Sequence, residues 1–243
     1  MPVVTVEMEL QQDTEAYDQL REKVRMDVAF LTIPESVQLP DMAFAIPIPV
    51  VTNRTGVDLT ALKAENEDFI AWLQIPGTTI DYPVVSTNDT NYYLNHTFSG
   101  KKSYLGTLLS LGKTDYQTPG KNIAIYGHHI RSNKETMFSP LLAYKEQSFY
   151  VGHETIYLDS LYHSGEYTIF AITNIHSGDW DPSKTDFISD EDFMSFVQRA
   201  RSQSLYETGI EVTAKDQILT LTTCDRSYIP TYGRLVVMAV KND

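Results

Sequence analysis

The sequence predicts a mainly β fold, an antiparallel or mixed barrel and not a doubly wound sheet. From about Ala71 onward, short apolar runs alternate with turns, and most runs are bounded by Gly, Pro, Asn, Asp or Ser, as strands usually are. No regular alternation of strands and helices is present, which argues against a parallel α/β fold. About eight strands are predicted. They cover residues 71–75, 79–86, 105–110, 122–126, 155–159, 167–174, 217–223 and 235–240.

The residues before these strands predict a helix, a connector and a second helix. Residues 13–31 repeat apolar positions at helical spacing, with Asp13 as a possible N-cap. The proline-rich residues 33–57 predict an extended connector or strap. The second helix begins at Asp58 and runs through residues 61–69.

Two further helices interrupt the strand region. Residues 134–144 follow a pair of histidines, and residues 190–204 have Ser189 or Asp190 available as an N-cap. The latter helix falls between the sixth and seventh predicted strands.

The charge of the chain excludes some partner classes. At 243 residues it is long enough for one compact domain with an appendage, and 19 Lys and Arg against 32 Asp and Glu give a formal net charge of −13. Nucleic acid and anionic membrane surfaces would repel such a protein at long range, so we expect neither as the main partner. Peptides and cell-wall material stay open.

The single cysteine excludes an intramolecular disulfide and a cysteine-based metal cluster. The adjacent His128 and His129 also make a poor metal pair, so we expect no metal and no cofactor. No run reaches the roughly 18 apolar residues of a membrane span, and no signal peptide opens the chain. Either the protein is soluble as made or a membrane anchor has been removed.

Cys224 occupies a position that favours a reactive thiol. It ends an alternating strand, whereas a structural cysteine would more naturally lie in mid-strand among apolar residues. Arg234 opens the next strand after a nine-residue loop, so a hairpin brings both side chains to one edge of the barrel. Thr222 and Thr223 are candidate donors near the thiol, with Thr223 the better placed, and Asp225 is a weaker candidate for orienting a catalytic group.

His128 is the preferred acid/base partner of this thiol. It follows a short apolar strand and a glycine, which lets the backbone turn and present the next side chain at the strand edge. A thiol attacks as the thiolate and needs a nearby base or cation. Arg234 would stabilise the oxyanion, and His128 would protonate the departing amine. His129 either orients the site or is simply exposed.

Together these residues resemble the signature of the sortases. The TLTTC sequence that ends at Cys224, the GRLVV sequence that holds Arg234 and the IYGHH sequence that holds His128 are similar to the motifs of that family. The segment from residue 65 to 106, the MFSPLLAY sequence and the helix at 190–204 resemble class B. One departure is the Leu-Leu-Ser-Leu sequence at residues 108–111, where class B members often carry an aromatic and an acidic residue.

The resemblance implies an eight-stranded sortase barrel with N-terminal helices and an extra helix between the sixth and seventh strands. Residues 1–57 would form an N-terminal helix and strap, and residues 58–243 the catalytic domain. The implied activity is a cysteine transpeptidase on the outer face of a Gram-positive membrane. It cleaves a C-terminal sorting signal after Thr, forms a thioester on Cys224 and transfers the acyl group to a cell-wall amine. The family's usual membrane anchor is missing, which implies a chain trimmed to its extracellular part.

Three alternatives stay open at this point. A pilin-polymerising class B sortase would use a pilin lysine as the acceptor with the same catalytic residues. The departure at residues 108–111 leaves open a catalytically silent, peptide-binding relative. A papain-like protease would place its cysteine early in the chain at the start of a helix, unlike Cys224.

Overall fold

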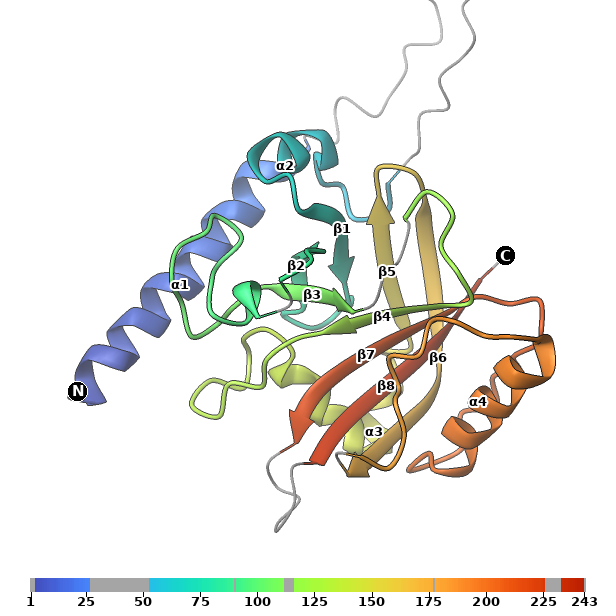
Figure 1. Ribbon diagram of the computed structural model, residues 1–243. Helices are drawn as coiled ribbons and strands as arrows, with labels where there is room; N and C mark the ends of the chain where they lie inside the picture. The colour runs from blue at the N-terminus through green and yellow to red at the C-terminus, as the bar shows by residue number, and fades with distance from the viewer. Residues whose placement is uncertain are drawn as a thin grey trace, which may run out of the picture.

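A closed barrel of eight strands forms the centre of the molecule (Figure 1). The computed structural model describes residues 3–26, 53–89, 91–111, 116–176, 178–225 and 233–242. Around the barrel the strands follow the order β1-β2-β3-β4-β7-β8-β6-β5. Their bounds are β1 Phe69–Gln74, β2 Asp81–Val85, β3 Leu108–Leu111, β4 Asn122–Tyr126, β5 Thr155–Ser160, β6 Ser164–His176, β7 Ile218–Asp225 and β8 Gly233–Lys241.

Helices cover the barrel from two sides (Figure 1). Two α-helices precede it, α1 and α2, and α4 lies between β6 and β7, where the sequence predicted a helix. Their bounds are α1 Val3–Val24, α2 Leu59–Glu65, α3 Gln147–Tyr150 and α4 Asp190–Ser202, with 3-10 turns η2 Tyr92–Leu94 and η3 Ser139–Lys145. None of the helices in the described ranges is long and apolar enough to cross a bilayer.

The first helix differs from the prediction at both ends. It begins at Val3, so Asp13 is a mid-helix residue and not an N-cap. Asp13 is almost wholly buried there, and its carboxylate pairs with the Lys101 ammonium at 2.9 Å. The helix ends at Val24, because Arg25 instead pairs with Val57 in an isolated β-bridge. Residues 27–52, which contain most of the predicted strap, lie outside the described residues.

Two other helices are shorter than predicted. Asp58 caps α2 as expected, since its side chain accepts a hydrogen bond from the Ala61 N–H, but α2 ends at Glu65. The next residue, Asn66, is extended at φ −141°, which starts the chain toward β1. Only the end of the predicted 134–144 helix forms, as the 3-10 turn η3, because Pro140 lacks an N–H and suits the first turn of a helix.

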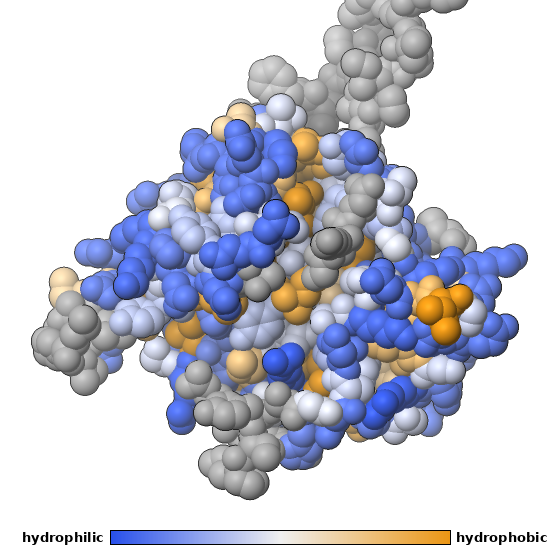
Figure 2. All heavy atoms as spheres, viewed as in Figure 1, coloured by the Kyte–Doolittle hydropathy of each residue, from blue (hydrophilic) through white to orange (hydrophobic). Residues whose placement is uncertain are grey.

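Two apolar clusters hold these elements together. The barrel interior includes Leu219 and Leu221 of β7 and continues into Tyr17, Leu20 and Val24 of α1. Since α1 shares this core, the division of the chain at residue 57 stays a prediction. The second cluster lies between α4 and the outer face of β6, β7 and β8. Its α4 members are Phe193, Phe196, Val197 and Ala200. Hydrophilic residues cover most of the face shown in Figure 2, in keeping with the net charge of −13.

The sheet order brings three strand ends to one place. β4 runs parallel to β7, with Tyr126 opposite Thr222, so both strands end at the same edge of the barrel. β8 runs antiparallel to β7 and therefore begins there, with Arg234 opposite Cys224. We call this place the site edge, the region where β4 and β7 end and β8 begins.

Candidate active site

Cys224 is the penultimate residue of β7 and is half-buried at the site edge. Side chains alternate between the two faces of a strand, and Leu219 and Leu221 point into the barrel, so Cys224 projects from the outer face. Its Sγ lies 3.1 Å from the hydroxyl oxygen of Tyr126, the last residue of β4. The thiol is thus held at the surface end of a strand whose remainder is buried.

Arg234 lies directly opposite Cys224 in the β7–β8 ladder. Residues directly opposite in an antiparallel pair project from the same face, with Cβ atoms about 5 Å apart. The two side chains therefore start from neighbouring positions on one face of the sheet, and Arg234 is only partly exposed. A guanidinium at this position can donate hydrogen bonds to an oxyanion that develops beside the thiol.

His128 follows the end of β4 by two residues. Its Nε2 lies 2.9 Å from the Leu94 carbonyl oxygen. Because a carbonyl only accepts hydrogen bonds, Nε2 is the donor, which leaves Nδ1 to exchange a proton. The ring stands edge-on to Tyr126, at 5.7 Å between ring centroids. Through the Tyr126 ring, the imidazole and the thiol belong to one cluster.

Gly127 makes this arrangement possible by its small size. A Cβ atom at this position would lie 2.5 Å from the Leu108 side chain and 2.7 Å from the Phe138 ring. No larger residue fits without displacing one of them. Because Gly127 has no side chain, the backbone passes close to Leu108 of β3 and places His128 at the site edge. The sequence alone indicated only the freedom of a glycine to turn.

The remaining predicted site residues make contacts that hold the end of β7 to neighbouring segments. The Thr223 hydroxyl is buried and donates to the Gly127 carbonyl at 2.7 Å, and the Thr222 carbonyl accepts from the Gly127 N–H at 3.1 Å. His129 Nδ1 lies 3.0 Å from the Cys224 carbonyl and donates to it. These contacts bind the end of β7 to the segment that carries His128.

Asp225 turns away from the thiol. As the residue after Cys224 it points to the opposite face of β7, where it is buried and forms an ion pair with the Lys145 ammonium of η3. Its carboxylate therefore fixes the end of β7 against η3.

Sequence reasoning missed Tyr126 and the Leu94 carbonyl. Tyr126 could have been noticed as the last residue of the strand before Gly127. The carbonyl has no signal in the sequence, because every residue has one. In the described part of the chain, no group of three or more His, Cys, Asp or Glu side chains is placed to hold a metal ion.

Comparison with known proteins identifies the family. The sequence model of the sortase domain matches residues 73–242. The chain belongs to the sortase family. It is 32% identical over 180 residues to sortase B of Staphylococcus aureus, strain NCTC 8325, covering 74% of this chain and 72% of that protein. It is 33% identical to sortase B of Listeria monocytogenes over the same length and with the same coverage.

Solved sortase B structures share the fold. A Clostridium perfringens sortase B superposes with a TM-score of 0.71 at 30% identity, over 76% of this chain and 100% of that one. The Staphylococcus aureus sortase B–substrate complex gives a TM-score of 0.70 at 30% identity, over 76% of this chain and 84% of that one. This sortase is therefore a class B member and a transpeptidase of the sortase type, with the eight-stranded barrel that the sequence predicted.

Proposed function

We propose that this sortase cleaves a C-terminal sorting signal after Thr and transfers the acyl group to a cell-wall amine, with Cys224, His128 and Arg234 as its catalytic residues. The observation that supports this most strongly is the register of β7 and β8. It sets the only thiol of the chain opposite a guanidinium, at the edge where β4 delivers His128. A nucleophile, a proton carrier and an oxyanion donor are what acyl transfer requires.

The first half-reaction forms the thioester. The Cys224 thiolate attacks the carbonyl carbon of the substrate Thr, and the carbonyl oxygen becomes an oxyanion that Arg234 stabilises. When the tetrahedral intermediate collapses, the C–N bond breaks and the departing amine takes a proton from the His128 imidazolium at Nδ1. The Tyr126 hydroxyl, 3.1 Å from Sγ, stabilises the thiolate by donating to it before attack.

The second half-reaction reverses these roles. An acceptor amine attacks the thioester carbonyl and gives a proton to the neutral His128. Collapse forms the new amide bond and releases the Cys224 thiolate, while His128, which took the proton of the amine, is again the imidazolium. No redox partner is needed at any step.

For the acceptor we propose a glycine-type amine of the cell wall, and for the location the outer face of a Gram-positive membrane. One related structure is described as sortase B complexed with triglycine, and the curated relatives come from Gram-positive bacteria. A pilin lysine is the alternative acceptor. Incubation with a sorting-signal peptide and either triglycine or a pilin domain separates the two, and use of the pilin lysine alone would reject the cell-wall proposal.

Variants of the three residues test the mechanism. Cys224→Ala should abolish turnover with the fold intact, because the residue lies at an edge. His128→Ala and Arg234→Ala should each lower kcat on the order of 10²-fold or more. A sorting peptide with a reactive ketone should add its mass to Cys224, as measured by mass spectrometry. Peptide binding without an adduct would instead indicate a catalytically silent, peptide-binding protein.

A further inference from the structure

Residues 93–107 form the segment that accepts the hydrogen bond from His128. Helix α1 holds this segment from the other side. On one side of this segment, the Leu94 carbonyl lies 2.9 Å from His128 Nε2. Gly106 lies beside the same ring without room for a side chain, since a Cβ there would lie 3.1 Å from His128 Cδ2 and 2.6 Å from the Tyr93 carbonyl. The Thr107 N–H donates to that Tyr93 carbonyl at 2.9 Å, so the residues around Leu94 are hydrogen-bonded to those around Gly106.

On the other side, the Tyr17 hydroxyl makes three contacts with this segment. It donates to the Gly106 carbonyl at 2.7 Å, lies 3.0 Å from Thr107 Oγ1 and accepts from the Phe98 N–H at 3.3 Å. Tyr17 is 3% exposed. Burial raises the pKa of its phenol, so the hydroxyl keeps its proton across the working range. One buried hydroxyl of α1 thus binds the glycine that lies beside the His128 ring.

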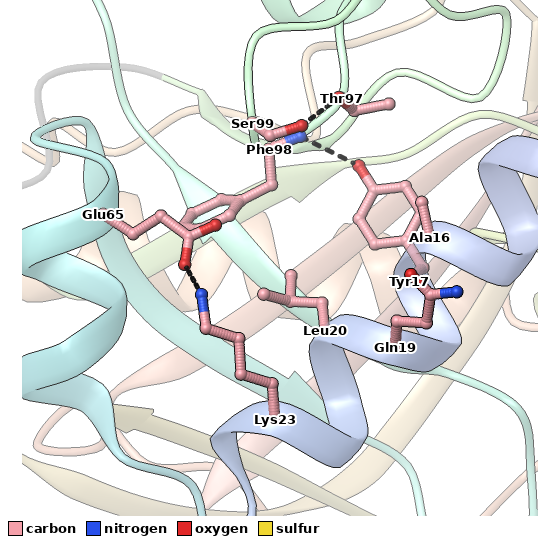
Figure 3. A pocket seen from close by; sticks show the side chains of 9 residues that line it. All are labelled: Ala16, Tyr17, Gln19, Leu20, Lys23, Glu65, Thr97, Phe98 and Ser99. Atoms are coloured by element: carbon pink, nitrogen blue, oxygen red, sulfur yellow. Dashed lines mark hydrogen bonds and ion pairs between the residues drawn. The ribbon is translucent and has the colours of Figure 1, made fainter.

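A pocket interrupts the packing between α1 and this part of the segment. It has a volume of about 220 Å³ and lies between α1, α2 and residues 97–99. Figure 3 shows the side chains that line it. The rings of Tyr17 and Phe98 and the side chain of Leu20 line it. Side chains that face the pocket have fewer packing contacts on that side, so the polar contacts add to the apolar ones in fixing their position. The second polar contact from α1 is the Asp13–Lys101 ion pair at 2.9 Å.

From this chain of contacts we propose that Tyr17 is a positioning residue for His128. By fixing Gly106, Thr107 and the segment around Leu94, it holds the imidazole with Nε2 as donor and Nδ1 toward the reaction. The inference rests on the proposed role of His128. It concerns a helix outside residues 73–242, the range that the sortase domain matches. The three proposed catalytic residues lie within residues 73–242, whereas Tyr17, which would orient one of them, lies before that range.

The test compares Tyr17→Phe with Tyr150→Phe. Both remove a buried helix hydroxyl that donates to a backbone carbonyl, and the Tyr150 hydroxyl donates to Ile169 at 3.3 Å, away from the site edge. Tyr17→Phe should lower kcat about tenfold with KM nearly unchanged, since a small misplacement of a catalytic group is costly. Tyr150→Phe should keep the kcat of the wild type. Equal kcat values for the two variants would overturn the inference.

Combining Tyr17→Phe with His128→Ala distinguishes an error in the role of Tyr17 from an error in the proposed function. If Tyr17 acts through His128, the loss of kcat caused by Tyr17→Phe should vanish in His128→Ala, because the two residues act as one unit. An undiminished loss in that background would overturn the inference. A fully active His128→Ala would reject the proposed function itself. An inactive His128→Ala beside a fully active Tyr17→Phe would reject only the role of Tyr17.

A spectroscopic readout tests the same point without turnover. In protein labelled with ¹⁵N-histidine, Tyr17→Phe should change the ring nitrogen signals of His128, and Tyr150→Phe should leave them unchanged. Unchanged His128 signals in Tyr17→Phe would contradict the proposal. If that variant fails to fold, Thr107→Val removes the hydroxyl that lies 3.0 Å from the Tyr17 oxygen and should shift the signals and kcat in the same sense. A Thr107→Val protein with wild-type signals and kcat would count against Tyr17.

Discussion

Helices α1 and α4 cover opposite sides of the barrel and are attached to it by different interactions (Figure 1). Helix α4 inserts the apolar Phe193, Phe196, Val197 and Ala200 against β6, β7 and β8. Helix α1 adds to its apolar contacts two buried polar ones, from Asp13 and Tyr17, to the segment behind His128. The described polar contacts of α4 run to its own neighbours, such as Lys184 and Asp179, and not to the site.

This difference shows that a helix that packs near the strand of Cys224 need not affect the candidate site more than a helix farther along the sheet. Cys224 projects from the same outer face of β7 that α4 covers further along. Apolar contacts are non-directional and tolerate small shifts, whereas a hydrogen bond fixes both distance and angle. We therefore expect changes in α4 to alter stability and changes in α1 to alter catalysis.

The largest expected effect is in α4. Phe193 is fully buried, and Phe193→Ala should lower the free energy of unfolding by about 3–5 kcal/mol, because it removes a ring and leaves a cavity. Urea unfolding measures this loss. At temperatures below its thermal unfolding midpoint, Phe193→Ala should have the same kcat as the wild type. A kcat as low as that of Tyr17→Phe would end the distinction between the two helices.

Replacement of Lys101, compared with replacement of Lys184, should give an intermediate effect on stability and on kcat. Lys101→Met leaves the buried Asp13 carboxylate without its cation and should cost about 1–2 kcal/mol. Because it loosens the segment behind His128, kcat should fall about threefold. The matched control is Lys184→Met, which removes an ion pair of 2.7 Å to Asp192 of α4, a carboxylate that is more exposed than that of Asp13. Unfolding and peptide cleavage are measured on both. The comparison fails if Lys184→Met lowers kcat equally.

The smallest effect concerns alkaline pH. Burial raises the pKa of Tyr17, as it does for Tyr116 and Tyr167, above the unfolded value of about 10. The folded state then keeps protons that the unfolded chain loses. The stability these groups contribute is complete below about pH 10 and declines as the pH rises toward the raised pKa values.

Between about pH 9 and pH 10.5, Tyr17→Phe should therefore lose less stability than the wild type, by less than about 1 kcal/mol. Urea unfolding at each pH measures the difference. Phe193→Ala serves as control and should retain the wild-type slope, because the second cluster contains no buried tyrosine among the described residues. If stability declined less steeply with pH in Phe193→Ala as well, the decline could not be attributed to the burial of Tyr17.

Much of the fold could be predicted because alternation and turn residues are local signals. The strand over residues 122–126 matches the prediction at both ends, since apolar residues fill it and Gly127 follows. The strand predicted over 167–174 extends to Ser164–His176, because pairing with β5 and β8 continues past its apolar part. The first helix was misplaced, since the burial of Asp13 depends on Lys101, a residue far along the chain.

The candidate site could be proposed from the sequence where side chains carry the chemistry. Strand ends and residue types are visible in the sequence, so Cys224, His128 and Arg234 could be proposed, and the structure places all three at one edge of the barrel. The Leu94 carbonyl and the Gly106 backbone could not be found in that way. Their positions result from the tertiary path of the segment over α1, which no local pattern encodes.

The parallel pairing of β4 with β7 also has a consequence for folding. The contacts that join the two strands at the site edge link residues 95 to 98 positions apart, such as Tyr126 with Cys224 and His129 with the Cys224 carbonyl. Pairings of such high contact order close a long loop and form slowly. Until that loop closes, the thiol has neither its tyrosine nor its imidazole nearby. If Cys224 is the nucleophile, as proposed, a newly made chain carries an ordinary cysteine, and the thiol gains its neighbours only when the barrel is complete.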